Sequence, residues 1–405
     1  MKVSYITMQF PVPSETFLSL DVEALRKQGH ELTVYGLRPN HKQHNQLMQE
    51  RDHEGLVVNN FSFKTLVLSL WFCLLHPWIF LSLLFWVVRV SFKTPKHLLK
   101  SLVLLPSVLG HFYKVYQFKP NVVHLFWGHY PSMLGYLVKR FMPDTVVSQF
   151  LGAHDLVTNY PGSAALAKNV DLLFTHSQSN LPMFEKMGID SRRVHVILRG
   201  TKLDFPYEGS LDKFNSLDAP IFLTASRLIE EKGIDDVIKI FNHVIELYPN
   251  ATLNVAGDGP YKSELIKLAD RLGCSKNVVF LGHIKQSSLI KLMSNSHFFV
   301  LMSRYPSERL PNVVKEAMYQ MCVVLTTQTE GINELIESNV SGYIVDKGDY
   351  LSGIDSIMNC LNNTKLSQKI TVEAKSVIKE RFDVKKSMQM YIDLWSMSLK
   401  RKKTP

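Results

Sequence analysis

Residues 220–248 read PIFLTASRLIEEKGIDDVIKIFNHVIELY, and this stretch decides the fold class. Pro220–Ala225 is a short apolar run, which is typical of a buried strand. From Ile234 onward the apolar residues recur every three or four positions, so we expect an amphipathic helix there. A strand that leads through a polar loop into a helix is the repeating unit of a parallel α/β sheet.

The same alternation of strand and helix extends in both directions from this stretch. Toward the carboxyl end, further strands are expected at Thr252–Val255, Val278–Leu281, Phe298–Leu301, Val323–Thr326 and Gly342–Val345. Toward the amino end, strands are expected at Val3–Ile6, Glu31–Tyr35, Asn121–Leu125, Thr145–Phe150, Asp171–Thr175 and Val194–Leu198. The predicted fold class is therefore α/β, with two Rossmann-like domains that face each other across a cleft.

A polar stretch over residues 205–217, which contains Pro206 and Gly209, separates the two halves. We therefore expect an amino-terminal domain over residues 1–205 and a second domain over residues 218–385. A carboxyl-terminal helix with a basic, mobile tail is expected over residues 386–405. Ligands of such folds bind beyond the carboxyl ends of the strands, so functional residues are expected in the loops after the strands.

Two of these loops carry a pattern of charged residues. The loop 226–233 places Arg227 and Lys232 just before a helix, and a helix start beside two cations is suited to a diphosphate. The loop after Leu301 leads to Glu308 and Glu316, of which Glu316 lies in or near the first turn of a helix and can accept hydrogen bonds from a ribose diol. The alternative for all four side chains is an ordinary solvated surface charge.

Together these segments resemble the family 4 retaining glycosyltransferases of the GT-B fold. Members show a strand followed by Arg, a Lys-Gly pair five residues on, then Gly-Asp-Gly-Pro, then a Glu-x7-Glu motif. The present sequence has Arg227, Lys232-Gly233, Gly257-Asp258-Gly259-Pro260 and Glu308–Met318 in the same order. Segments 329–334 and 341–345 match the family's next two conserved segments, and the resemblance extends over about residues 220–345.

The resemblance implies specific roles on the donor side. Arg227 and Lys232 would bind the diphosphate of a nucleotide diphosphate sugar, Glu316 would bind its ribose, and Glu308 would lie near the transferred sugar. The donor-binding motif positions are Gly257, Leu310, Pro311 and Asn312. A nucleotide sugar is then a co-substrate, and we expect no cofactor and no metal, because the sequence shows no convincing Asp-x-Asp motif.

The first half resembles the family more loosely, through Phe10–Phe17 and Gly29-His30-Glu31, which look like the opening of members that build extracellular polysaccharides. Ser14, which could cap the first helix, and Glu15 are acceptor-side candidates, as is His129. The family's His-x-x-Asp motif corresponds here to a segment with His154 and Asp155, which become catalytic candidates. His124 is a further candidate for the cleft. Among the departures, Arg309 stands where the family usually has Gly, and the loop before Glu308 is two residues longer than common.

Composition and charge narrow the compartment and the partners. Of 405 residues 46% are hydrophobic and 20% charged, as in ordered globular proteins, and the four cysteines lack the spacing of a zinc site or a disulfide framework. No secretory signal precedes the first strand, so a cytoplasmic location is expected. The net charge is +10, and no acidic residue occurs between Glu54 and Asp144. This basic stretch is also rich in apolar residues, which favours an anionic membrane surface over nucleic acid as a partner.

The membrane-interface segment is expected over about residues 61–119. Thr65–Val88 contains no formal charge and as one helix would reach roughly 36 Å, enough to cross a bilayer. The strands before and after it belong to one sheet and must lie on one side, and Pro77 interrupts the helix, so we expect interfacial helices instead of a span. The alternative is a helical pair that packs on the first domain.

The sequence thus predicts a metal-independent, hexosyltransferase-like retaining enzyme at the inner face of the membrane. It would move a sugar to a lipid-linked or membrane-proximal saccharide acceptor in surface polysaccharide biosynthesis. A nucleotide-sugar epimerase of the same fold and a catalytically inactive membrane-associated scaffold are the alternatives.

Overall fold

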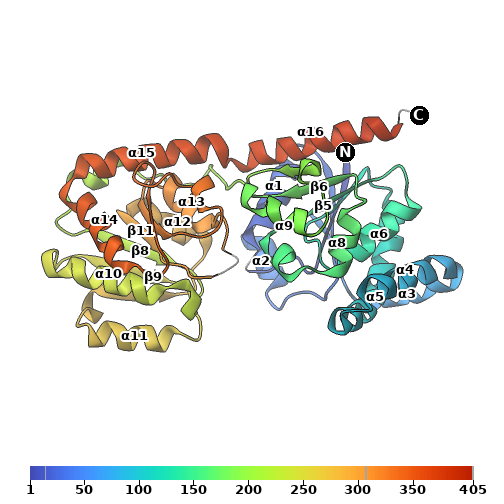
Figure 1. Cartoon of the computed structure of the whole chain (residues 1–405), viewed down its shortest axis with the longest axis horizontal. Helices are drawn as coiled ribbons and strands as arrows, with labels where there is room; N and C mark the ends of the chain where they lie inside the picture. The colour runs from blue at the N-terminus through green and yellow to red at the C-terminus, as the bar shows by residue number, and fades with distance from the viewer. Residues whose placement is uncertain (14, 306–307, 404–405) are drawn as a thin grey trace. The chain divides into compact units, whose positions relative to one another are not determined.

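The computed structural model describes residues 1–13, 15–305 and 308–403 (Figure 1). The described chain forms two compact units. The first unit contains Met1–Arg199 together with the segment that begins at Val384, and the second contains Gly200–Asp383. The first unit therefore ends at residue 199, earlier than the expected boundary at residue 205, and it is built from two separate parts of the chain.

The first unit is built on a seven-stranded sheet with the order β3-β2-β1-β4-β5-β6-β7, in which every pair of neighbours is parallel. The strands are β1 (Lys2–Thr7), β2 (Glu31–Gly36), β3 (Val57–Asn60), β4 (Val122–Leu125), β5 (Val146–Phe150), β6 (Leu172–Thr175) and β7 (Val194–Val196). The six expected strands of this half are all present, within about two residues at their ends. The edge strand β3 was not predicted.

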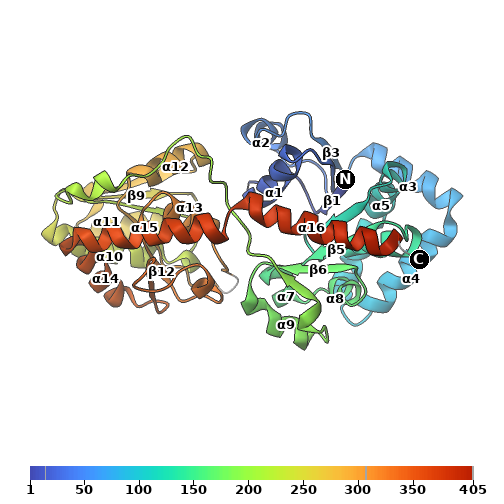
Figure 2. The same ribbon diagram turned by 90° about the horizontal axis from the view of Figure 1, so that it is seen from above.

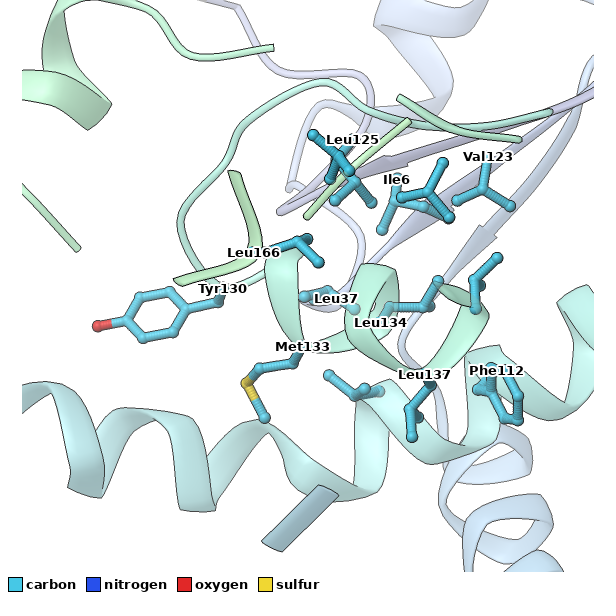
Figure 3. Packing of buried hydrophobic residues seen from close by; sticks show 14 of the residues in the cluster. Ile6, Leu37, Phe112, Val123, Leu125, Tyr130, Met133, Leu134, Leu137 and Leu166 are labelled. Atoms are coloured by element: carbon cyan, nitrogen blue, oxygen red, sulfur yellow. The ribbon is translucent and has the colours of Figure 1, made fainter. Parts of the chain in front are cut away.

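Helices cover both faces of this sheet. They are α1 (Thr16–Lys27), α2 (His44–Glu50), α3 (Phe63–Leu75), α4 (Pro77–Ser91), α5 (Pro95–Phe118), α6 (Ser132–Phe141), α7 (Ala153–Thr158), α8 (Pro161–Ala167), α9 (Leu181–Lys186) and α16 (Val384–Lys403). One core cluster lies where α5 and α6 pack on the sheet (Figure 3). A second cluster is formed with α1 and α16.

Helix α16 is an integral part of the first unit and lies along its sheet (Figure 2). Trp395 is fully buried, and its Nε1 donates a hydrogen bond to Ser148 Oγ at 3.0 Å on β5. The Lys402 ammonium group donates to the main-chain oxygens of Pro143 and Thr145 at 2.9 and 2.8 Å. The tail, which we expected to be mobile, is therefore helical and anchored as far as Lys403.

The second unit repeats the architecture with a six-stranded parallel sheet of order β10-β9-β8-β11-β12-β13. Its strands are β8 (Ile221–Ala225), β9 (Thr252–Ala256), β10 (Val278–Gly282), β11 (Phe298–Leu301), β12 (Val323–Thr327) and β13 (Tyr343–Val345). Its helices are α10 (Ile234–Leu247), α11 (Lys262–Arg271), α12 (Gln286–Asn295), α13 (Asn312–Tyr319), α14 (Tyr350–Asn362) and α15 (Thr364–Arg381). All six strands and the helix from Ile234 agree with the sequence prediction.

Helices α3, α4 and α5 form the insertion between β3 and β4 (Figure 1). By length and composition α5 could cross a membrane, and α3 with α4 could do so as one broken span. The two helices are bent by 105° at His76, where Pro77 begins α4. Residues Leu105, Leu109 and Phe112 of α5 are buried in the core of the unit. Since β3 and β4 lie in one sheet, the insertion leaves that sheet and returns to it.

Candidate functional site

In each unit the strand order reverses beside its first strand. The first sheet reverses between β1 and β4, and the second between β8 and β11. At such a point the loops after the two strands diverge to opposite faces and leave a hollow at the carboxyl edge, where ligands of open α/β sheets bind. The charged loops 226–233 and 303–311 come directly after β8 and β11, so both donor-side motifs lie at this edge of the second unit.

Lys232 and Glu308 form an ion pair at this edge. Each side chain is mostly buried, and Ser303 Oγ also donates to the Glu308 carboxylate at 2.9 Å. Desolvation makes a buried pair sensitive to the loss of either partner. An incoming diphosphate would compete with Glu308 for the Lys232 ammonium group. The structure thus brings together the two residues that the sequence assigned to the diphosphate and to the transferred sugar.

Close main-chain packing holds the loops of this edge together. Gly233 has φ +65°, and a Cβ atom there would lie 1.9 Å from the main-chain oxygen of Met302. Gly257 has φ +131°, and its Cβ would lie 1.8 Å from the main-chain oxygen of Ser226. Only glycine fits both the conformation and the space. The glycines of the two motifs therefore place the Lys232 loop against the strand that leads to Glu308.

Arg227 lies in the same loop with an exposed side chain. The main chain around it is fixed, since Ser226 N donates to Ala256 O and Leu228 N donates to Asp258 O, at 3.1 and 3.0 Å. A fixed loop that carries a solvent-accessible guanidinium group can offer that group to an anionic ligand at small entropic cost. The geometry is compatible with the predicted role of Arg227.

Glu316 lies on α13 and is buried, with 5% of its surface exposed. Its Oε1 accepts a hydrogen bond from Gln286 Nε2 at 2.7 Å. Burial raises the pKa of the Glu316 carboxyl to about 7. The sequence placed this glutamate at a helix start where its charge would be favoured, but in the ligand-free protein the loss of water dominates. Its charge is therefore poised near neutral pH.

The pKa of Glu316 leads to a prediction for donor binding. Because the folded-state pKa lies above the ordinary value, the carboxyl stabilises the ligand-free fold below about pH 4.5, and this contribution is lost as the pH rises to about 7. A ribose diol needs the ionised form as a double acceptor. We expect donor affinity measured by calorimetry to fall below pH 7 and to level off above it. Glu316→Gln should bind weakly with no such dependence, and an unchanged slope in this variant would contradict the assignment.

The remaining donor-motif residues shape the approach to α13. Pro311 is buried before the first helical residue, Asn312, whose side chain accepts a hydrogen bond from Lys315 Nζ at 3.1 Å. Leu310 has φ +34°, a conformation that costs a residue with a Cβ. The Arg309 side chain is buried, pairs with Glu330 and donates to the main-chain oxygen of Glu308 at 3.1 Å. The basic side chain that replaces the usual Gly is thus turned to Glu330.

The acceptor-side candidates meet at the carboxyl edge of the first sheet. His129 Nδ1 lies 3.0 Å from Asp155 Oδ1, and Asp155 is 1% exposed. The other oxygen of Asp155 accepts a hydrogen bond from Gly152 N at 3.2 Å, so Asp155 also caps α7. Glu15 accepts a hydrogen bond from Trp127 Nε1 at 3.0 Å, and burial raises the pKa of Glu15. His129 and Asp155 therefore form an oriented pair, which the sequence did not predict.

The structure places three other candidates differently. Ser14 lies outside the described residues. His154 is exposed, with Nε2 3.3 Å from the hydroxyl of Tyr160, and Asp155 is paired with His129 instead. His124 is a core residue of β4, 2.6 Å from Ser148 Oγ, and burial lowers its pKa to about 3. The suggestion that His124 lines a cleft is therefore wrong.

Comparison with known proteins agrees with this arrangement. Residues 211–377 match the family described as Glycosyl transferases group 1. An uncharacterised glycosyltransferase of Methanocaldococcus jannaschii is 38% identical over 136 residues, which span 33% of this chain and only 32% of that relative. The lipopolysaccharide core biosynthesis glycosyltransferase LpsE of Rhizobium meliloti is 23% identical over 65% of this chain and 79% of its own length.

Solved structures show the same fold over the whole chain. The crystal structure of Anabaena HepE in complex with UDP matches with a TM-score of 0.73 at 18% identity, and covers 98% of this chain and 100% of that one. At this identity the likeness is one of fold. With the matched motifs of the second unit, it leads to one assignment: the chain belongs to the group 1 glycosyltransferases of polysaccharide-biosynthesis type and has the GT-B fold.

Proposed function

We propose that this protein is a retaining glycosyltransferase that transfers a sugar from a nucleotide diphosphate sugar to a lipid-linked or membrane-proximal saccharide acceptor in surface polysaccharide biosynthesis. The observation that carries the proposal is the Lys232–Glu308 pair at the carboxyl edge of the second sheet, where α10 begins one residue after Gly233. A cation beside a helix start suits a diphosphate, and a carboxylate beside that cation suits the developing positive charge of a sugar.

The chemistry depends on these charges. As the bond between the anomeric carbon and the diphosphate oxygen breaks, Lys232 and Arg227 stabilise the negative charge on the leaving group. An acceptor hydroxyl attacks the same face of the sugar, and its proton passes to the departing phosphate oxygen. The Glu308 carboxylate stabilises the positive charge that develops on the ring. Two cations supply the charge that a metal supplies elsewhere, so we propose a metal-independent reaction.

The acceptor side is assigned to the first unit. Asp155 holds the ring of His129 by its Nδ1 atom, which leaves Nε2 to contact an acceptor hydroxyl. Glu15 and Trp127 lie nearby, on loops at the same edge of the sheet. Because HepE was solved with UDP, a UDP-sugar is the first donor to test here.

Release of nucleoside diphosphate from a panel of nucleotide sugars tests this function, with and without a membrane extract as the acceptor source. We expect release with one donor, stimulation by the extract, and a sharp fall in kcat in Glu308→Gln. Product analysis by NMR should show the donor's anomeric configuration retained. An isomerised nucleotide sugar with no release would indicate an epimerase. Neither product, with intact nucleotide binding, would indicate a scaffold.

Membrane association is proposed from the insertion α3–α5. Exposed apolar side chains on its helices form what we call the apolar strip: Phe63, Val67, Leu70, Trp71, Leu74, Leu75, Trp78, Leu81, Phe85, Val88, Phe92, Leu99 and Val103. Trp78 is 80% exposed and Phe63 is 79% exposed. Arg89 and Lys93 are exposed at the end of α4 and just beyond it. An apolar face bordered by cations is the pattern of a helix that lies in the interface of an anionic membrane.

We expect the purified protein to bind vesicles that contain anionic lipid, without spanning them. The double variant Trp78→Ser/Phe85→Ser should bind at least about tenfold more weakly, because each buried aromatic contributes about 1.5–3 kcal/mol. Leu351→Ser, which removes an exposed apolar residue of the second unit, is the matched control. Flotation of vesicles measures the binding. A wild-type protein that does not float would refute the membrane proposal.

A further inference from the structure

A small hollow lies in the first unit where the insertion meets the His129 loop. Its walls come from α4, α5, the loop after β4 and the start of α8. Aromatic and histidine side chains contribute much of its lining: Trp86, His97, His129, Tyr130 and Tyr160. The roles proposed so far use only His129 among these residues.

Tyr160 is the centre of this set of rings. Its ring centroid lies 5.1 Å from that of His97, 5.2 Å from that of His129 and 5.6 Å from that of Tyr130. The hydroxyl of Tyr130 lies 3.3 Å from His97 Nδ1, and Figure 3 shows it pointing away from the apolar cluster. Through His129 the set reaches Asp155. A continuous series of rings therefore connects the insertion with the His129–Asp155 pair.

The chemistry of this lining suits a sugar ring. Saccharides present apolar C–H faces and hydroxyl edges, which aromatic faces and Tyr or His polar atoms complement. Trp86 is held flat on Tyr136 at 4.7 Å, so its place in the wall is fixed. The opposite wall is close, because a Cβ on Gly162 would lie 3.3 Å from the Trp86 ring.

The surroundings of the hollow are cationic and then apolar. Lys96 and Lys100 flank His97 on α5 and, after burial, contribute to the lowering of its pKa. The chain has no acidic residue between Glu54 and Asp144, so nothing on the insertion itself offsets these charges. On α4, exposed Phe85 and Val88 flank the lining residue Trp86 in sequence. A ligand in the hollow could therefore extend past cations onto the apolar strip.

We propose that this hollow is the head-group subsite for an acceptor in which a phosphate joins a saccharide to a long hydrocarbon chain. The hydrocarbon chain lies along the apolar strip, the phosphate contacts Lys96, Lys100 and His97, and the first sugar lies against Tyr160 beside His129. The inference rests on the proposed function, because it assigns the acceptor of that reaction.

Binding of a polyprenyl phosphate in detergent micelles to the full chain, without donor, tests the subsite directly. The wild type should bind it more tightly than the matching polyprenol, and inorganic phosphate should bind weakest. His97→Ala/Lys100→Ala should lower the affinity at least about tenfold. Lys64→Ala removes an exposed cation of the same insertion and should change it less than about twofold. Equal binding of phosphate and alcohol, or equal losses in the two variants, would overturn the proposal.

Kinetics separate this proposal from the proposed function. If the chain transfers sugar, Tyr160→Phe and His97→Ala should raise KM for a polyprenyl-phosphate-linked saccharide while KM for the nucleotide sugar stays within about twofold. If no nucleotide sugar is turned over, the proposed function fails, and the binding measurement still decides the subsite. Transfer with an unchanged acceptor KM in both variants would overturn the subsite alone. Circular dichroism shows whether each variant is folded.

Discussion

Lys232→Ala should reduce kcat/KM for sugar transfer by about 10²–10³-fold, which corresponds to about 2.7–4 kcal/mol at the barrier. The ammonium group lies beside Glu308 at the start of α10, where the charge of the departing diphosphate is expected to develop. Steady-state release of nucleoside diphosphate measures the loss. Lys267→Ala is the control, because Lys267 is an exposed cation of the same unit that pairs with Glu264 at 2.8 Å. This variant should keep wild-type kinetics.

A second comparison separates catalysis from stability. Loss of Lys232 leaves the Glu308 carboxylate without its cation, which by itself destabilises the fold. In Lys232→Ala/Glu308→Gln that uncompensated charge is removed, so the melting temperature should recover while activity stays low. If activity returns together with the melting temperature, Lys232 acts only by stabilising Glu308, and the proposed diphosphate site is misplaced.

Gly257→Ala and Gly233→Ala should each lower the free energy of unfolding by about 2–5 kcal/mol, the sum of a left-handed backbone and an overpacked contact. Each new methyl group would meet a main-chain oxygen under 2 Å away, that of Ser226 and that of Met302 respectively. Neither oxygen can move without displacing a loop of the donor edge. We therefore expect nucleotide binding to be lost together with stability, as measured by urea denaturation and calorimetry.

Gly273→Ala supplies the matched control for these variants. Gly273 has φ +76°, and a Cβ there would have no heavy atom within 4 Å. The substitution should cost only the backbone term, about 1–2 kcal/mol, and leave nucleotide binding intact. If Gly257→Ala is no worse than Gly273→Ala, the close main-chain approach does not hold the donor loops.

The sequence predicted the second unit well because its signals are local. Each strand is a short apolar run that leads into a loop, and α10 has a clear helical period over Ile234–Leu247. The Lys232–Glu308 contact could be anticipated since both loops come after neighbouring strands of a parallel sheet. Arg309 is different. Its turn toward Glu330 depends on a loop whose path no periodicity records.

The first unit was harder to predict because its key contacts are tertiary. Strand β3 is short and half-exposed, so it lacks the apolar run that marks a central strand. A histidine such as His124 gives no local sign of being buried under Trp395, which is far away in sequence. Tyr160 and His97 were missed for the same reason. Only the folded chain brings α5 and the start of α8 to His129.

The return of α16 to the first unit has a consequence for how this protein is made. The ribosome must complete the whole of Gly200–Asp383 before it adds the helix that supplies Trp395 to the first unit's core. Until then the apolar niche of Tyr5 and Phe174 lacks its cover, and the nascent first unit depends on chaperones or on delay. A fragment that stops at Arg199 should aggregate, whereas the second unit expressed alone is a continuous segment with its own core. The two halves of this fold are thus unequal as autonomous folding units.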